Sequence, residues 1–143
     1  MIPNTIIRAL NKEAIGIYGN GQQIRDWLYV DDHIKGIFKI VFDGIIGETY
    51  NIGGNNERSN NEVVNIICSY LDEIAQPPNS IGSHKELIRY IKDRPGHDLK
   101  YAINSDKLSK NLGWKQEENF ESGIKKTINW YIENENWWNN ISI

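Results

Sequence analysis

The chain has 143 residues, of which 39% are hydrophobic and 24% are charged, so we expect one folded domain with a sizeable core rather than a disordered chain. The net charge of −3, without any lysine or arginine block, gives no electrostatic support for nucleic-acid binding. The chain shows neither an apolar run long enough to span a membrane nor a basic signal-peptide segment, and its single cysteine excludes an internal disulfide and argues against a metal site. We therefore predict a cytoplasmic protein with no membrane, nucleic-acid or metal partner.

The first part of the chain is typical of a helix followed by two strands and a second helix. Apolar spacing predicts a helix over 3–12, a strand over 15–18 that ends at a glycine turn, and a strand over 24–30. Asp31 or Asp32 should cap a helix to about residue 42. Its apolar stripe consists of Ile34, Ile37, Phe38 and Val41.

The remainder alternates in the same way. We expect a strand over 48–52, a helix over 59–75 that begins with a Ser59–Glu62 capping box, and a surface loop over 76–85 in which His84 is incidental. A strand over 87–92 follows, and then helices over 105–112, capped by Ser105, and 120–134. Cys68 falls on an apolar helical face and is expected in the core. This order predicts a small mixed α/β unit.

The run Asp93-Arg94-Pro95-Gly96-His97-Asp98 carries the most chemistry in the chain. Pro95 and Gly96 predict a turn that would hold Arg94 and His97 in a fixed relation. Because a guanidinium matches a phosphate through two parallel hydrogen bonds, the run could be a diphosphate clamp. It could also be a surface turn whose arginine pairs with a nearby aspartate.

Two more runs precede it, Tyr18-Gly19-Asn20-Gly21-Gln22-Gln23-Ile24-Arg25-Asp26-Trp27-Leu28-Tyr29-Val30-Asp31-Asp32-His33 and Tyr50-Asn51-Ile52-Gly53-Gly54-Asn55-Asn56-Glu57. Taken together, with Tyr101-Ala102-Ile103 after the third, they resemble the C-terminal part of the dTDP-glucose 4,6-dehydratase family, which belongs to the extended short-chain dehydrogenase/reductases. The resemblance runs from Met1 to about Trp138.

The resemblance implies that residues 1–143 are the sugar-nucleotide substrate-binding region of a larger NAD-dependent enzyme, without its Rossmann domain. The family's catalytic Tyr-x-x-x-Lys pair has no counterpart, because no tyrosine here is followed four residues later by lysine. We therefore expect no catalytic residue and no NAD site in this chain. The implied partners are a dTDP-sugar and the missing Rossmann half, for which an exposed apolar face should remain. The full-length enzyme should be a homodimer.

The resemblance also implies which residues bind the substrate. Arg25 and Arg94 would contact the diphosphate and ribose, although Arg25 could instead pair with Asp26 or Asp31. Tyr18 would hold the base, or pack as an ordinary strand residue, and Asn60 would contact the nucleotide or cap its helix. His97 would donate to phosphate or ribose, and otherwise would be merely exposed. The remaining assigned positions are Asp93, which would orient Arg94 or cap the turn, Pro95, Gly96, Ile17, Gly16 (where the family usually has proline) and Met1, at a substrate loop.

The function implied for the whole enzyme is conversion of dTDP-glucose to dTDP-4-keto-6-deoxyglucose, a lyase step in rhamnose-type nucleotide-sugar synthesis. Two alternatives stay open: a UDP-sugar epimerase or decarboxylase of the same superfamily, and a stand-alone, non-catalytic nucleotide-sugar-binding module.

Overall fold

The computed structural model describes residues 1–75, 77 and 81–140, which form two compact units. The first unit comprises residues 1–22, residues 59–97 and the chain from residue 124 onward. The second comprises residues 23–58 and 98–123. Each unit therefore contains segments that are far apart in the sequence.

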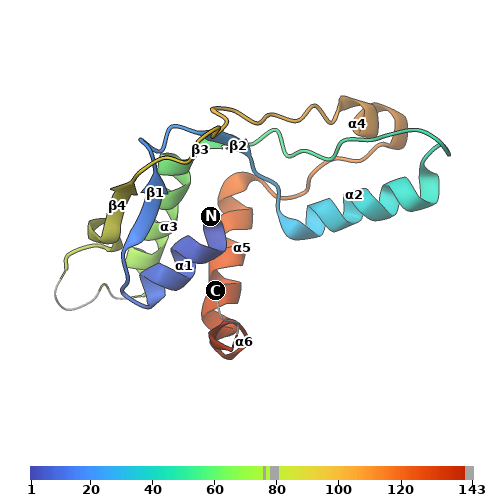
Figure 1. Cartoon of the computed structure of the whole chain (residues 1–143). Helices are drawn as coiled ribbons and strands as arrows, with labels where there is room; N and C mark the ends of the chain where they lie inside the picture. Colours follow the sequence, from blue (N-terminus) through green and yellow to red (C-terminus); the bar gives the residue numbers. More distant parts are fainter. Residues whose placement is uncertain (76, 78–80, 141–143) are drawn as a thin grey trace. The chain divides into compact units, whose positions relative to one another are not determined.

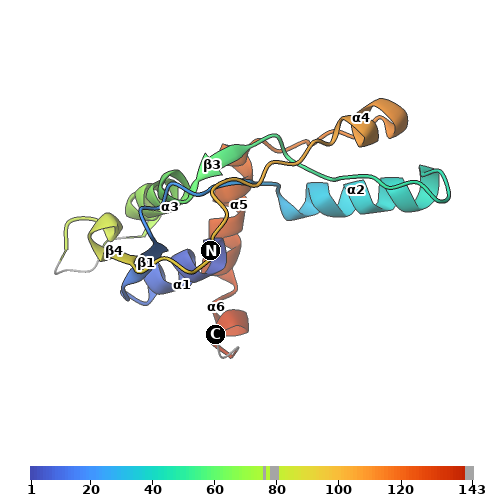
Figure 2. The same ribbon diagram turned by 45° about the horizontal axis from the view of Figure 1, so that its top comes forward.

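The first unit is built around a pair of parallel strands, β1 (Ile15–Tyr18) and β4 (Ile88–Ile91), which lie side by side in Figures 1 and 2. Its helices are α1 (Ile2–Leu10), α3 (Asn60–Ile74), the 3-10 turn η1 (His84–Leu87), most of α5 (Phe120–Glu133) and α6 (Glu135–Asn139). Its core side chains, at most 4% exposed, include Ile6, Ala9, Ile15, Ile17, Val63, Val64, Ile67, Cys68, Leu71, Ile124, Ile128 and Trp138. Cys68 in the core confirms its prediction.

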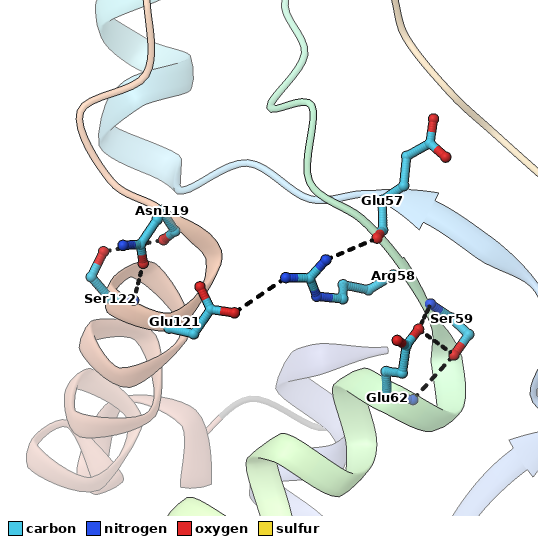
Figure 3. A network of polar contacts seen from close by, with 7 residues as sticks. All are labelled: Glu57, Arg58, Ser59, Glu62, Asn119, Glu121 and Ser122. Atoms are coloured by element: carbon cyan, nitrogen blue, oxygen red, sulfur yellow. Dashed lines mark hydrogen bonds and ion pairs between the residues drawn. The ribbon is translucent and has the colours of Figure 1, made fainter.

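The helix α3 begins as predicted. The Ser59 side chain accepts a hydrogen bond from the backbone N–H of Glu62, and the Glu62 carboxylate accepts one from the backbone N–H of Ser59, as Figure 3 shows. This reciprocal pair satisfies two backbone donors that a helix start otherwise leaves without partners. The capping box is confirmed.

The second unit contains β2 (Ile24–Asp26), α2 (Val30–Asp43), β3 (Glu57–Ser59, whose last residue belongs to the first unit) and α4 (Asp106–Leu112), and α4 packs beside α2 (Figure 1). Asp32 is 1% exposed, and its carboxylate accepts a hydrogen bond of 2.9 Å from the backbone N–H of Glu118. In the same unit, Arg58 pairs with Glu121 at 3.2 Å at the start of α5 (Figure 3). Few large side chains are buried here, so polar contacts hold much of this unit.

One face of α2 and the loop after it is exposed and apolar. Only Asp32 and Gly36 are buried along this helix. The exposed apolar residues are Val30, Ile34, Ile37, Phe38, Val41, Phe42, Ile45 and Ile46. A helix that exposes this much apolar surface is typical of one that packs against another protein surface.

Several element predictions were wrong, each for an identifiable reason. Residues 48–52 form no strand, since no described segment pairs with them. The strand expected over 24–30 ends at residue 26, and α2 begins at Val30 with Tyr29 as its N-cap, so neither Asp31 nor Asp32 caps it. Ser105 holds the N-cap position of α4, but its hydroxyl bonds the Gly53 carbonyl instead. Part of the loop expected over 76–85 lies outside the described residues.

Candidate functional site

Two turns meet at the carboxyl ends of β1 and β4. In the parallel pair, Tyr18 lies opposite Ile91, and the N–H of Gly19 donates to the Ile91 carbonyl at 2.9 Å. Because parallel strands end at the same edge, the turn at 19–21 and the turn at 93–97 leave the sheet together. The sequence motif around Arg94 is thereby brought next to Tyr18.

The second turn is organised by Asp93. Its Oδ1 accepts a hydrogen bond of 2.9 Å from the backbone N–H of Arg94 and lies 2.6 Å from His97 Nδ1. Pro95 and Gly96 form the turn itself, and Gly96 takes a φ of 68°, which few residues other than glycine adopt readily. Asp93 therefore caps the turn, which confirms one of its two predicted roles.

His97 and Tyr18 face each other edge to face, with ring centroids 6.3 Å apart and an interplanar angle of 87°. The His97 side chain is only 6% exposed, so the alternative of a merely exposed loop histidine is wrong. Tyr18 is 47% exposed, so its ring retains accessible surface for a ligand to contact. The two rings thus form a fixed aromatic surface beside the Arg94 turn.

Gly19 is required for this approach. It has a φ of 59°, and a Cβ at this position would lie 2.6 Å from Asp93 Oδ2. Any larger residue would push Asp93 away from the first turn.

The Arg94 guanidinium is exposed and makes neither a hydrogen bond nor an ion pair with any described residue. The alternative in which this arginine pairs with a nearby aspartate is therefore wrong within the described part of the chain, because Asp93 bonds the backbone of Arg94 and not its side chain. A free guanidinium on a braced turn can donate two parallel hydrogen bonds to the oxygens of a phosphate.

Arg25 belongs to the second unit. Its Nη1 donates to the Ile24 carbonyl at 2.7 Å, its Nη2 donates to the Asp98 carbonyl at 3.0 Å, and its Cζ lies 4.9 Å from the Tyr101 ring centroid. These neutral partners orient the guanidinium without cancelling its charge. Arg25 therefore keeps the ability to bind an anion.

Asp26 and Asp31, the alternative partners predicted for Arg25, do not pair with it in the described part of the chain. The Asp26 carboxylate accepts hydrogen bonds from the backbone N–H groups of Gly54 at 2.8 Å and Asn56 at 2.7 Å. No carboxylate forms an ion pair with Arg25 among residues 1–75, 77 and 81–140. The predicted cross-strand ion pair is thus wrong for this part of the chain.

Asn60 is the first residue of α3 and is partly buried. The cap is Ser59, so the alternative in which Asn60 caps the helix is wrong. In β1, Ile17 is buried in the core and Gly16 is exposed, and Met1 is the N-cap of α1. Ligand contacts by these four residues stay predictions.

His84 was misjudged from the sequence. It is 3% exposed, its Nδ1 lies 2.5 Å from Asp72 Oδ1, and its backbone N–H donates to the same oxygen at 2.8 Å. The Ser83 hydroxyl donates to Asp72 Oδ2. Partial burial raises the pKa of Asp72, but these hydrogen bonds from His84 and Ser83 lower it further, so its pKa lies below the usual value. The cluster fastens η1 to α3 and is structural.

Within the described ranges, no group of His, Cys, Asp or Glu residues has the arrangement of a metal site. Likewise, none of the helices that the structure describes is both long and apolar enough to cross a membrane. The Arg94 turn and the Tyr18–His97 pair offer a cation and aromatic rings, which suit a ligand with phosphates and a base.

The chain is similar to known proteins over nearly its whole length. The family model described as GDP-mannose 4,6 dehydratase matches residues 1–127, and the chain belongs to this family. Among curated relatives, dTDP-glucose 4,6-dehydratases from Escherichia coli and Neisseria meningitidis serogroup B are 52% and 46% identical over 142 residues. These matches cover 99% of this chain but only 39% and 40% of the relatives, at their C-terminal part.

A solved structure is similar as well. The dTDP-glucose 4,6-dehydratase from Bacillus anthracis, in complex with NAD, is 39% identical with a TM-score of 0.83, and the match covers 96% of this chain and 40% of that one. The mixed helix-and-strand fold is thus that of the C-terminal region of extended short-chain dehydrogenase/reductase dehydratases, as predicted. The chain spans about two fifths of the length of the relatives it matches.

Proposed function

We propose that this chain forms the dTDP-sugar-binding region of a dTDP-glucose 4,6-dehydratase, the lyase that produces dTDP-4-keto-6-deoxyglucose. The observation that carries this proposal is the Arg94 guanidinium, which is unpaired among the described residues and sits on a turn braced by Asp93 and His97 beside Tyr18. The names of relatives about 50% identical supply the substrate class.

Each residue has a role in this proposal. Arg94 and Arg25 bind phosphate oxygens, Tyr18 contacts the base, and His97 and Asn60 hydrogen-bond ribose or phosphate. Asp93 acts on the ligand through His97 and the turn, because its Oδ1 is bonded within the turn.

The residues that the structure describes do not fit NAD. The dinucleotide fold places a glycine-rich turn between a strand and a helix. Here the turn at 19–21 connects β1 to β2, and α3 follows a serine cap rather than a glycine-rich turn. NAD, which the Bacillus anthracis relative binds, would therefore be held by another part of the enzyme. The isolated chain should show no dehydratase turnover when NAD is added, and turnover by a pure sample would contradict this.

We further propose that the exposed apolar face of α2 receives the NAD-binding part of a longer dehydratase. The length of the relatives supports this partner, as do two features of the described residues: they contain no dinucleotide cradle, and 48–52 has no strand partner among them. The chain should co-purify with the NAD-binding part of a relative when both are co-expressed, and Val41→Asp should abolish this while Ile132→Asp, at an exposed position on α5, should not. Co-purification that survives Val41→Asp would contradict the proposal, and no co-purification at all would favour a stand-alone binding module.

The test of nucleotide binding is calorimetric titration of the whole chain with dTDP and with UDP. Arg94→Ala should weaken dTDP binding by roughly ten- to hundredfold, because a charged hydrogen bond contributes about 1.5–3 kcal/mol. Arg89→Ala is the matched control. Arg89 lies on β4, the strand that precedes the Arg94 turn, and its guanidinium donates hydrogen bonds to the backbone carbonyls of Glu86 and Ile88. Equal losses in both variants would mean that only overall charge matters, and tighter binding of UDP would favour the epimerase alternative.

A further inference from the structure

Asn61, the second residue of α3, contacts two other segments of the first unit. Its backbone N–H donates to the Gly21 carbonyl at 3.0 Å, and its Nδ2 donates to the Asn20 carbonyl at 2.8 Å. Its Oδ1 accepts a hydrogen bond of 3.3 Å from the Tyr90 hydroxyl on β4. The first turn, the start of α3 and β4 are therefore joined through one side chain.

The turn is shaped to receive this side chain. Gly21 is buried with a φ of 71°, and a Cβ on it would lie only 2.0 Å from Asn61 Oδ1. On the other side of the same turn, Gly19 admits Asp93 in the same manner. The side chains of Asn61 and Asp93 thus contact the turn at its two ends. Each has room only because the turn residue beside it is glycine.

The position of Asn61 relates it to the proposed ligand residues. Asn60 directly precedes Asn61 in the sequence, and Tyr18 directly precedes the turn at 19–21 that Asn61 contacts. Tyr90 lies on β4, and this strand leads into the turn that carries Arg94. Each polar atom of the Asn61 side chain already has a partner in the protein. Asn61 is therefore suited to fix ligand-binding groups rather than to contact the ligand.

We infer that Asn61 is a positioning residue that fixes Tyr18 relative to Asn60 in the site for the nucleoside-diphosphate sugar. This inference rests on the proposed function and goes beyond it, because neither the sequence motifs nor the resemblance assigns Asn61 a role. The bond to Asn20 holds the first turn, and the bond from Tyr90 couples that turn to β4 and so to the Arg94 motif.

The test uses Asn61→Ala in the whole chain, with Asn65→Ala as matched control. Asn65 lies one helical turn later, and its amide donates to the Asn61 backbone carbonyl rather than to the turn at 19–21. Asn61→Ala should weaken dTDP binding about tenfold while the urea midpoint changes little, since alanine has high helix propensity and offsets part of the loss. Backbone amide exchange should accelerate at 18–21 and stay unchanged within α3. Asn65→Ala should change none of these.

The outcomes separate this inference from the proposed function. Wild-type binding that Asn61→Ala leaves intact would overturn the inference and leave the proposed function standing. A wild-type chain that binds no dTDP would count against the proposed function for this chain. In that case amide exchange would still test Asn61, because unchanged exchange rates at 18–21 in Asn61→Ala would show that Asn61 does not hold the turn and would overturn the inference. Faster exchange throughout α3 would show general destabilisation and would also overturn the inference.

Discussion

Asp93 Oδ1 lies 2.6 Å from His97 Nδ1 and also accepts the backbone N–H of Arg94. One carboxylate oxygen thus closes the turn and orients the imidazole. The other oxygen is directed at Gly19, where a Cβ would come within 2.6 Å of it. Asp93 therefore connects the two turns of the candidate site.

Asp93→Ala should weaken dTDP binding several-fold and leave the unfolding midpoint nearly unchanged, because the carboxylate is 39% exposed. The measurement is calorimetric titration beside urea unfolding. Asp98→Ala is the control, since Asp98 contacts Arg25 through its backbone carbonyl, which is unchanged in the variant. A loss of affinity as large in Asp98→Ala would contradict the special role of Asp93.

Gly19→Ala should destabilise the chain more than Gly113→Ala. Both glycines have left-handed backbone, with φ of 59° and 69°, and an alanine there costs about 1 kcal/mol in strain. Gly113 has nothing within 4 Å of an added Cβ, whereas Gly19 has Asp93, so Gly19→Ala adds a clash to the strain. Urea unfolding of both variants measures the difference, and equal losses would show that Asp93 moves aside without cost.

Asp72→Asn should lower the free energy of unfolding at pH 7 by about 1–3 kcal/mol, because charged hydrogen bonds to His84 and Ser83 are weakened. The pKa of Asp72 is lowered in the folded state, so its contribution is present above its unfolded pKa of about 3.9 and is lost as the pH falls through the lower folded value. The difference between wild type and variant should therefore shrink below about pH 4. Unfolding curves from pH 3 to 7 test this, with Glu73→Gln as the neighbouring control; a constant difference would contradict it.

Cys68 should be unreactive in the folded chain. Burial raises the pKa of its thiol to about 12, so roughly one molecule in ten thousand carries the thiolate at pH 8, and the side chain is also inaccessible. A disulfide reagent should therefore label Cys68 only as the first unit unfolds, and the labelling rate in urea should follow the unfolding transition. Fast labelling of native protein would show that α3 opens locally.

Local patterns could be predicted from the sequence where the interacting residues are close together. The Ser59–Glu62 capping box and the Pro95–Gly96 turn are examples, since every partner lies within four residues. The strand predicted over 48–52 was wrong because a strand requires a partner, and its apolar pattern cannot show whether one is present. His84 and Asn61 were missed because their partners, Asp72 and Asn20, are distant in sequence, and neither residue type signals a long-range bond by itself.

The candidate ligand residues could be named from motif resemblance, but their environment could not. That Arg94 is unpaired among the described residues while Arg25 is held by carbonyl groups depends on side-chain geometry. That Tyr18 meets His97 depends on the parallel pairing of strands on either side of a long intervening segment.

The same pairing has a kinetic consequence. Ile15 pairs with Ile88 only after the long intervening segment has closed into a loop, which is a slow step because closure costs entropy before any contact offsets it. The Tyr18–His97 ring pair cannot form before this closure, so a ligand that binds there would recognise only molecules in which β1 and β4 have paired. Added dTDP should therefore slow unfolding without speeding refolding.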